Sequence, residues 1–155
     1  MAKEIERKFI VAKDGWKKLD LLKKHNIEQG YILNIADLAV RIRTSDDEAW
    51  LTIKTNGRGI TRDEYEYQIP HADGLALIKK AAVTLKKVRH YVRDEKNQLW
   101  EIDVFKGLNR GLVLAEIELL SARTHVDLPT WLGREVSEDA HYFNTYLVDH
   151  KVPTK

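Results

Sequence analysis

The chain has 155 residues, of which 43% are hydrophobic and 32% charged, a composition typical of one globular domain rather than a disordered chain. Its 26 Lys and Arg nearly balance its 24 Asp and Glu, giving a net charge of +2, which argues against a general nucleic-acid binder. It has no cysteine, which excludes disulfides and Cys-based metal sites.

No apolar run approaches the roughly 20 residues that a membrane-spanning helix needs. The amino-terminal residues are charged from Lys3 on and contain no signal-peptide core. We therefore expect a soluble, cytoplasmic protein with neither nucleic acid nor a membrane as its partner.

In the first half of the chain, apolar and charged residues alternate as in half-buried strands. The segments concerned are 4–9, 28–33, 38–44, 50–55 and 62–69. After the first segment, Asp14 is predicted to cap a helix that carries Trp16, Leu19 and Leu22 and ends near His25. Asn56-Gly57-Arg58-Gly59 predicts the turn of a hairpin.

In the second half, Asp73 is predicted to cap a helix that runs through Ala82, with Leu75, Ile78 and Ala82 as its buried stripe. Strands follow at 85–93, 99–105 and 112–120, then a short turn or helix from Pro129 to Gly133. Ser137 is predicted to cap a last helix. Its stripe of Tyr142, Phe143, Tyr146 and Leu147 indicates either core packing or a helix that plugs one mouth of a barrel.

The count is about eight strands, connected mostly as hairpins, with helices inserted. This order predicts an α+β fold that is mainly antiparallel β. The arrangement it favours is a closed or nearly closed antiparallel barrel with helices packed outside.

One face of seven of these strands carries charges of both signs. The basic set is Lys8, Arg41, Arg43, Lys54, Lys87 and Arg89. The acidic set is Glu4, Glu6, Glu64, Glu66, Asp103, Glu116 and Glu118. A solvated outer surface is the ordinary interpretation of such a face. Here the face seldom uses Ser, Asn or Gln, and the apolar helices need the other side of the sheet, so an inward-facing set is favoured.

Inward charges are costly unless they are satisfied. Arg and Lys suit phosphate oxygens, with a planar fork and a point charge respectively. Clustered carboxylates suit hard divalent cations such as Mg²⁺ or Mn²⁺. A polyphosphate with its metal needs both signs, so the face indicates a metal–triphosphate site.

Glu4-x-Glu6-x-Lys8 resembles the ExExK signature of the CYTH superfamily, the triphosphate tunnel metalloenzymes. The other charged positions follow in family order, and the resemblance runs from Glu4 to about Leu147. It implies an eight-stranded tunnel barrel as a single domain over residues 1–155, similar to a short bacterial-type inorganic triphosphatase.

By that resemblance, the basic set is expected to grip the triphosphate and the acidic set to hold Mg²⁺ or Mn²⁺, two ions per site. Lys54 or Lys87 is expected to orient or deprotonate the attacking water, and the choice between them is open. Glu6 is counted with these two lysines as catalytic. Arg62 and Arg58 are candidates for contact with the outer end of a substrate.

Because nothing in the chain indicates a nucleobase pocket, metal-dependent hydrolysis of inorganic triphosphate is the expected activity, with nucleoside triphosphates as further candidates. A class IV-type adenylyl cyclase and a thiamine triphosphatase are the alternatives, and a non-catalytic polyphosphate- or nucleotide-binding module is the alternative of another class. A homodimer is left open. The six histidines form no spaced ligand set, and Arg7, on the apolar side of its strand, is expected to pack its stem under the first helix.

Overall fold

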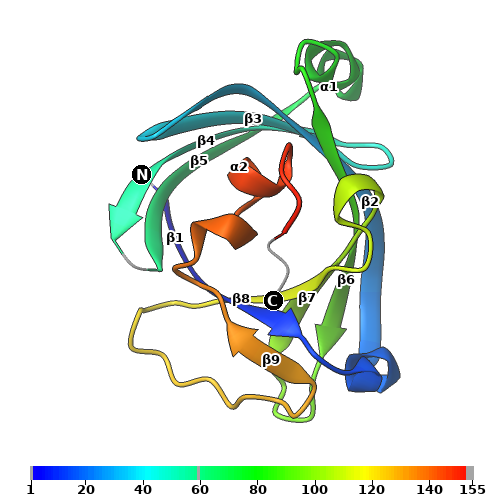
Figure 1. The fold of residues 1–155 in the computed structure, drawn as a ribbon, viewed down its shortest axis with the longest axis vertical. Coiled ribbons are helices and arrows are strands. Elements are labelled where there is room, and N and C mark those ends of the chain that lie inside the picture. Colours follow the sequence, from blue (N-terminus) through cyan, green and yellow to red (C-terminus); the bar gives the residue numbers. More distant parts are fainter. Residues whose placement is uncertain (1, 59, 153–155) are drawn as a thin grey trace.

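Antiparallel strands that close on themselves form the body of the fold (Figure 1). The computed structural model describes residues 2–58 and 60–152. The strands within them are β1 (Ala2–Val11), β2 (Asp20–Ile35), β3 (Leu38–Thr44), β4 (Ala49–Arg58), β5 (Thr61–Ile69), β6 (Thr84–Arg93), β7 (Leu99–Phe105), β8 (Val113–Glu118) and β9 (Leu132–Glu135). The α-helices are α1 (His71–Ile78) and α2 (Asn144–Leu147), and the 3₁₀ helices are η1 (Asp14–Lys18), η2 (Gly107–Asn109) and η3 (Ala140–Tyr142).

Strand β1 closes the barrel. The hydrogen-bonded order is β5, β4, β3, β2, β6, β7, β8, β1, and β1 also pairs with β5. The register sets Glu4 opposite Arg62 and Lys8 opposite Glu116. The predicted closed, eight-stranded antiparallel barrel is therefore confirmed, with β9 as an added strand beside β1.

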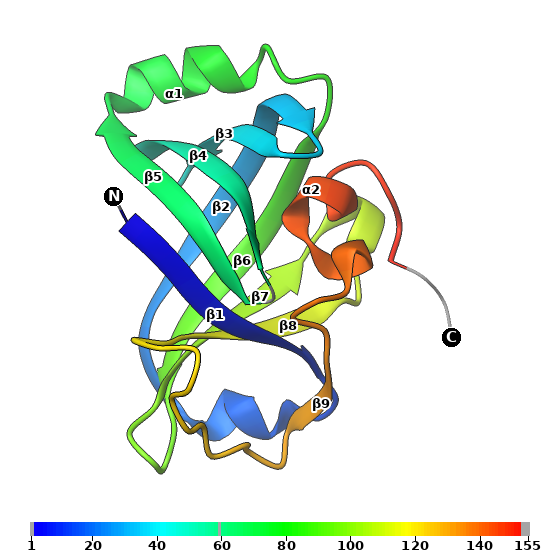
Figure 2. The ribbon, with the colours of Figure 1, turned by 90° about the vertical axis from the view of Figure 1, so that its left-hand side faces the viewer.

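The outward faces of β1, β6, β7 and β8 carry one apolar core. It gathers Phe9, Trp16, Val92, Trp100, Ile102, Ala115, Ile117, Leu119, Val126 and Trp131. Figure 2 shows that η1 and β9 lie at the same end of the molecule, opposite α1. Burying a large apolar side chain contributes about 2 kcal/mol, so this outer core can stabilise the barrel while its inner face stays polar.

The inside of the barrel has an apolar end. Leu85, Phe105 and Leu114 lie on the inward faces of β6, β7 and β8, where they meet the C-terminal segment, residues 136–152, through Tyr142 and Leu147. Figure 1 shows α2 inside the ring of strands. Core packing is thus confirmed for Tyr142 and Leu147 of the final apolar stripe, and the plugging of one mouth of the barrel stays a prediction.

The predicted helix from Asp14 to His25 is wrong beyond its first turn. Only η1 is helical, and β2 begins at Asp20. Trp16 is buried as expected, but Leu22 is 44% exposed. Residues 20–30 pair with β6, and residues 28–35 pair with β3. These ladders satisfy the backbone of a long strand, which outweighs the helical spacing of three apolar residues.

The second helix starts earlier and ends sooner than predicted. It begins after Pro70, so Asp73 lies in its first turn rather than at its cap, and it ends at Ile78. Leu75 and Ala82 are exposed, and of the predicted stripe only Ile78 is buried. Gly74 lies so close to Ala49 and Thr44 that a Cβ at this position would collide with Ala49. The face of α1 that carries Gly74 is therefore the buried one, because glycine has no side chain to prevent the close packing.

Three further local predictions are corrected near the ends of strands. The turn or short helix predicted from Pro129 to Gly133 is shorter than expected: the Leu132 N–H donates to the Pro129 carbonyl, and residues 132–135 then form β9. Ser137 caps no helix, because η3 is capped by Asp139. Strand β4 continues to Arg58, which pairs with Thr61, so the predicted turn at 56–59 is shorter than expected, and Gly59 lies outside the described residues.

Strand β9 also explains Arg7, whose guanidinium binds the Glu135 carboxylate through Nε and Nη2, at 3.0 and 2.6 Å, rather than packing under the first helix. In residues 2–58 and 60–152, no helix has the length and apolar character required to cross a membrane.

Candidate active site

The polar part of the barrel interior is a cavity of about 680 Å³. The predicted cations that line it are Lys8, Arg41, Arg43, Lys54 and Arg89. The predicted carboxylates that line it are Glu4, Glu6, Glu64, Glu66, Glu116 and Glu118. The alternation of each strand thus brings the charged face inward, while the apolar face packs outside.

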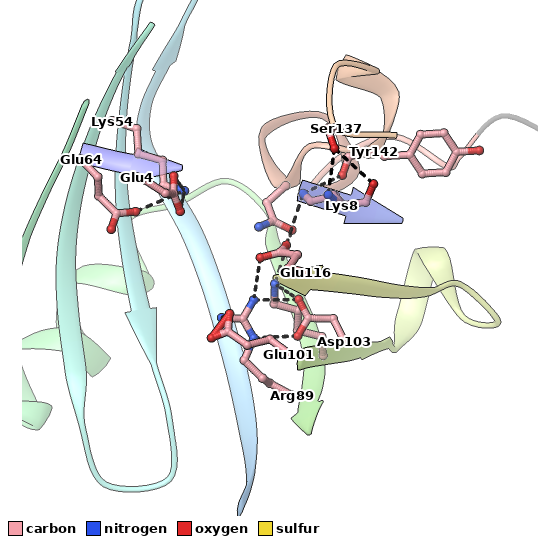
Figure 3. Close-up of polar contacts among 12 residues, drawn as sticks. Glu4, Lys8, Lys54, Glu64, Arg89, Glu101, Asp103, Glu116, Ser137 and Tyr142 are labelled. Carbon is pink, nitrogen blue, oxygen red and sulfur yellow. Dashed lines mark hydrogen bonds and ion pairs between the residues drawn. The ribbon is translucent and has the colours of Figure 1, made fainter. Parts of the chain in front are cut away.

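One ionic group joins β1, β4 and β5 (Figure 3). Lys54 Nζ donates to Glu4 Oε2 at 3.0 Å and lies 3.3 Å from Glu64 Oε2. Burial and the nearby Arg41 lower the pKa of Lys54, but the carboxylates Glu4, Glu6 and Glu64 outweigh them, and the net effect raises this pKa. Lys54 is therefore an ammonium ion at neutral pH.

A second group joins β3, β4 and β5. The Glu66 carboxylate lies 3.9 Å from Arg41 Nη2 and 3.6 Å from Arg43 Nη2, and it accepts a hydrogen bond from Thr52 Oγ1 at 3.1 Å. These ion pairs are long compared with a charge-assisted hydrogen bond of 2.7–2.9 Å. The two guanidinium groups are held near one another and keep donors available.

The third group is the most deeply buried and lies on β6, β7 and β8 (Figure 3). Arg89 binds Asp103 with two hydrogen bonds of 2.8 Å, and Lys87 Nζ donates to the same carboxylate at 2.7 Å. Arg89 also reaches Glu101 at 3.1 Å and Glu116 at 3.7 Å. Asp103 thus fixes the orientation of two cations.

Lys87 and Asp103 do not line the cavity. Both are 1% exposed and lie behind the cavity wall, close to the apolar end, where Lys87 Nζ is 3.5 Å from Asn144 of the C-terminal segment. Burial lowers the pKa of Lys87 to about 8, although Asp103 opposes the change. The sequence predicted that these two residues share the inner face, but it could not show that the wall covers them.

Lys8 connects the cavity to the C-terminal segment. Its Nζ lies 3.4 Å from Glu116 Oε1 and donates to the Tyr142 carbonyl at 3.2 Å. Its backbone N–H donates to Ser137 Oγ at 2.9 Å. One residue of the first strand therefore holds both a carboxylate of the cavity and the segment that closes it.

The pKa values of Glu6 and Glu116 are shifted in opposite directions. Burial raises the pKa of Glu6 well above its ordinary value, and the neighbouring Glu116 and Glu4 carboxylates raise it further. Burial acts the same way on Glu116, but Lys8, Arg89 and Lys87 outweigh it and hold the pKa of Glu116 well below its ordinary value. In residues 2–58 and 60–152, no Lys or Arg forms an ion pair with Glu6, whereas Glu116 pairs with Lys8 and Arg89.

The sequence analysis did not assign a site role to Glu101 or Tyr91, both of which line the cavity. Glu101 shares its strand face with Asp103, so the alternation that selected Asp103 could also have selected Glu101. Gln29 is 1% exposed, its Nε2 has no hydrogen-bond partner among the described residues, and it faces the same cavity. Arg62, raised as a candidate, also lines the cavity, and so does Tyr31.

No histidine of residues 2–58 and 60–152 lines the cavity, and His90 packs against Trp16 with ring centroids 5.1 Å apart. In the same part of the chain, no three His, Asp or Glu side chains form a ready-made metal cluster. Glu4, Glu64, Glu66 and Glu116 of the cavity each lie within ion-pair distance of a cation, whereas Glu6 lies beside Glu116.

Comparisons with known proteins give consistent results. The inorganic triphosphatase of Acetivibrio thermocellus is 41% identical over 150 residues, covering 96% of this chain and 94% of that protein. The inorganic triphosphatase of Nitrosomonas europaea is 36% identical over 151 residues, covering 93% and 95%. A crystal structure of the inorganic triphosphatase NE1496 matches with a TM-score of 0.68 at 33% identity, covering 96% and 95%.

A sequence model described as the CYTH domain matches residues 2–148. That range takes in every strand of the barrel and the C-terminal segment as far as α2. With both relatives above 30% identity over nearly the whole chain, this protein belongs to the CYTH domain family.

Proposed function

We propose that this protein is a divalent-metal-dependent tripolyphosphatase, a hydrolase that releases phosphate from inorganic triphosphate, with nucleoside triphosphates as further candidate substrates. The observation that carries the proposal is the cavity in the barrel, which is lined by both cations and carboxylates. The names of the two relatives above 30% identity support the same reaction.

In this proposal the phosphate oxygens bind to Lys8, Arg41, Arg43, Lys54 and Arg89. Arg41 and Arg43 form only long ion pairs with Glu66, so a phosphate can replace that carboxylate with shorter hydrogen bonds. Lys87 contributes indirectly, because it shares Asp103 with Arg89 and keeps the guanidinium aimed at the cavity.

The carboxylates fit a hard divalent cation such as Mg²⁺ or Mn²⁺, which takes oxygen ligands. Glu6 is the observation that tests this fit, since it is buried next to Glu4 and Glu116 and its pKa is raised well above normal. A nearby cation would relieve that repulsion. Glu4, Glu6, Glu64, Glu66, Glu116 and Glu118 would hold one or two such ions, and Asp103, held by two cations behind the wall, would support them.

When bound, the ion would neutralise phosphate charge and lower the pKa of a water molecule. The protein's own groups then position the reacting atoms. Lys54 lines the cavity and is charged, so it acts as a donor that orients the attacking water or a phosphate oxygen. Lys87 has the lower pKa but lies behind the wall, so we assign the direct role to Lys54.

We further propose that residues 1–155 act as one domain in the cytoplasm, with a small triphosphate rather than a nucleic acid as partner. The near-balanced charge of the chain supports the second point. A homodimer stays a prediction.

An activity assay tests the reaction directly. The purified protein is incubated with tripolyphosphate, ATP or thiamine triphosphate and with Mg²⁺ or Mn²⁺, and phosphate, pyrophosphate and cyclic AMP are measured. We expect phosphate from tripolyphosphate at the highest rate. Pyrophosphate with cyclic AMP would indicate a cyclase, and tight binding without any product would indicate a binding module.

Two variants test the residues. Glu6→Gln and Lys54→Ala should each lower the rate about tenfold or more, because the first removes a carboxylate that would hold the metal and the second removes a cation that stabilises the transferring phosphate. The exposed Lys3, which pairs with Asp63 on the surface, supplies the control Lys3→Ala, which should leave the rate unchanged. Wild-type rates in both cavity variants would contradict the site assignment.

A further inference from the structure

Arg62 differs from every other cation that lines the cavity. Lys8, Arg41, Arg43, Lys54 and Arg89 each form an ion pair with a carboxylate. The Arg62 guanidinium forms none with any Asp or Glu of residues 2–58 and 60–152, and its contact is with an aromatic ring. It is therefore a cavity cation whose hydrogen-bond donors are not taken up by an acid.

Arg62 lacks an ion pair with a described acid although a carboxylate residue lies opposite it in the neighbouring strand. The β1–β5 register sets Glu4 directly opposite Arg62, and side chains that are opposite each other in an antiparallel pair have Cβ atoms about 4.5–5.5 Å apart. The Glu4 carboxylate turns instead to Lys54, which donates to both of its oxygens at 3.0 and 3.2 Å. Arg62 forms no ion pair with a described acid because the acid opposite it in the register is held by Lys54.

The ring that Arg62 contacts belongs to the C-terminal segment. The Arg62 guanidinium carbon lies 4.4 Å from the centre of the Phe143 ring, and Lys8 Nζ lies 5.6 Å from the same centre. Lys8 also donates to the carbonyl of Tyr142, the residue before Phe143. Lys8 of β1 and Arg62 of β5 thus both lie near the Phe143 ring, and all three residues line the cavity.

We propose that Arg62 is a further substrate-binding residue, which holds a terminal phosphate of the substrate where the C-terminal segment closes the cavity, and that Phe143 positions it there. The inference rests on the proposed triphosphatase function and adds to it the residue that binds one end of the chain of phosphates.

Three features support this role. Arg62 is the inward-facing residue of β5 nearest the β4–β5 turn, and Glu64 and Glu66 follow it on the same face, so it lies at the end of the charged array. A guanidinium presents a planar fork that matches two phosphate oxygens. A cation–π contact is weaker than hydrogen bonds to a charged phosphate, so substrate can draw the guanidinium away from the ring.

The test is the steady-state kinetics of Arg62→Ala with tripolyphosphate. A contact made equally before and during the reaction affects KM rather than kcat. We expect KM to rise about tenfold or more, as for loss of a charge-assisted hydrogen bond, with kcat changed by less than about threefold. Arg62→Lys keeps the positive charge but lacks the planar fork. Its KM should lie between that of the wild type and that of Arg62→Ala.

Arg134→Ala is the matched control. Like Arg62, Arg134 contacts an aromatic ring of the C-terminal segment: its guanidinium carbon lies 5.5 Å from the centre of the Tyr142 ring. Unlike Arg62, its side chain is 54% exposed and does not line the cavity. Its loss should leave KM unchanged. Phe143→Leu keeps an apolar side chain without the ring and should raise KM by less than Arg62→Ala does.

The outcomes separate the two proposals. A wild-type protein that releases no phosphate refutes the triphosphatase function itself. An active wild type whose KM is unchanged in Arg62→Ala refutes the role of Arg62 alone. A fall in kcat with unchanged KM also refutes it, because that result would place Arg62 in the chemical step or in the structure.

Discussion

Asp94 illustrates how much a single carboxylate determines in this chain. Its Oδ1 accepts the backbone N–H groups of Lys96 and Gln98, both at 2.9 Å, and its Oδ2 accepts Gln98 Nε2 and the indole N–H of Trp100, both at 2.8 Å. Burial raises the pKa of Asp94, but these hydrogen bonds outweigh it and lower the pKa. The turn between β6 and β7 is fixed by this residue, and so is the central tryptophan of the outer core.

Asp94→Ala should therefore destabilise the protein without changing the site. We expect the free energy of unfolding at pH 7 to fall by about 1–2 kcal/mol, because the Trp100 N–H loses its partner. Because the folded pKa is lowered, this stability is present above the unfolded pKa of about 3.9 and is lost as the pH falls through the folded pKa. Urea unfolding at pH 7 and pH 3 measures both effects.

The control for Asp94 is Glu95→Ala, in the same turn but exposed. It should leave the unfolding free energy unchanged at both pH values. An equal loss of stability in Asp94→Ala at pH 7 and pH 3 would contradict the assignment to the ionised carboxylate.

At the scale of elements, the C-terminal segment is held by one buried amide. Asn109 of η2 is 2% exposed. Its Nδ2 donates to the carbonyls of Leu147 and His150 at 2.9 and 3.0 Å, and its Oδ1 accepts the Val152 N–H at 2.7 Å. Three backbone groups of the segment thus depend on a side chain that lies outside it.

Asn109→Ala should loosen the segment while the barrel stays folded. We expect hydrogen exchange of the amides in residues 144–152 to accelerate about tenfold or more, since each buried bond contributes about 1 kcal/mol. Strands β3 and β4 should exchange as in the wild type. Asn34→Ala removes one exposed hydrogen bond, to the Thr145 carbonyl, and should have a smaller effect. Faster exchange throughout the barrel would show that Asn109 supports the whole fold instead.

The elements also show what sequence can and cannot predict. Strands such as 38–44 and 99–105 were predicted to the residue, because alternation over seven positions is a local signal that burial on one face enforces. β9 was missed because Gly133 and Pro129 indicate a turn, and its pairing with β1 joins residues far apart in the chain. The start of β2 was missed because its pairing with β6, not its own pattern, makes it a strand.

The same limit applies to the site. Alternation was sufficient to choose the inward charges, so most predicted residues line the cavity. How deeply each inward side chain is buried could not be predicted. The position of Lys87 behind the cavity wall, for example, depends on its contacts with Asn144 and Phe105. Whether Arg62 forms an ion pair with an acid of the described residues depends on whether Glu4 turns to it or to Lys54, and only the folded geometry decides that.

At the scale of the whole molecule, the cations and carboxylates of the cavity are arranged largely as ion pairs. Most of its cations are paired with its carboxylates, and no described set of acids is preassembled for a metal. A triphosphate that takes the cations leaves the carboxylates with unpaired charge. Metal and triphosphate should therefore bind cooperatively. Triphosphate takes the cations that compete with the metal for the carboxylates, and the metal takes the carboxylates that compete with triphosphate for the cations.

This coupling can be measured by calorimetry with a non-hydrolysable triphosphate analogue and Mg²⁺. We expect the Kd of the analogue to fall about tenfold or more when Mg²⁺ is present, and the Kd of Mg²⁺ to fall by the same factor with the analogue, since coupling is reciprocal. The binding of Mg²⁺ to free analogue is measured separately and subtracted. Glu6→Gln should weaken the coupling, and equal analogue affinity with and without Mg²⁺ would contradict it.

The closure of the barrel by β1 has a consequence for the order of folding. β1 is made before β5 and β8, and its contacts with both are among the most distant in sequence. Such contacts form slowly because a long loop must close first. Glu4, Glu6 and Lys8 all lie on this strand, so a chain emerging from the ribosome carries these three groups from the start but gains a complete cavity only at its last pairing step. Recovery of activity after unfolding is thus expected to follow the slowest phase of refolding, after most of the secondary structure has returned.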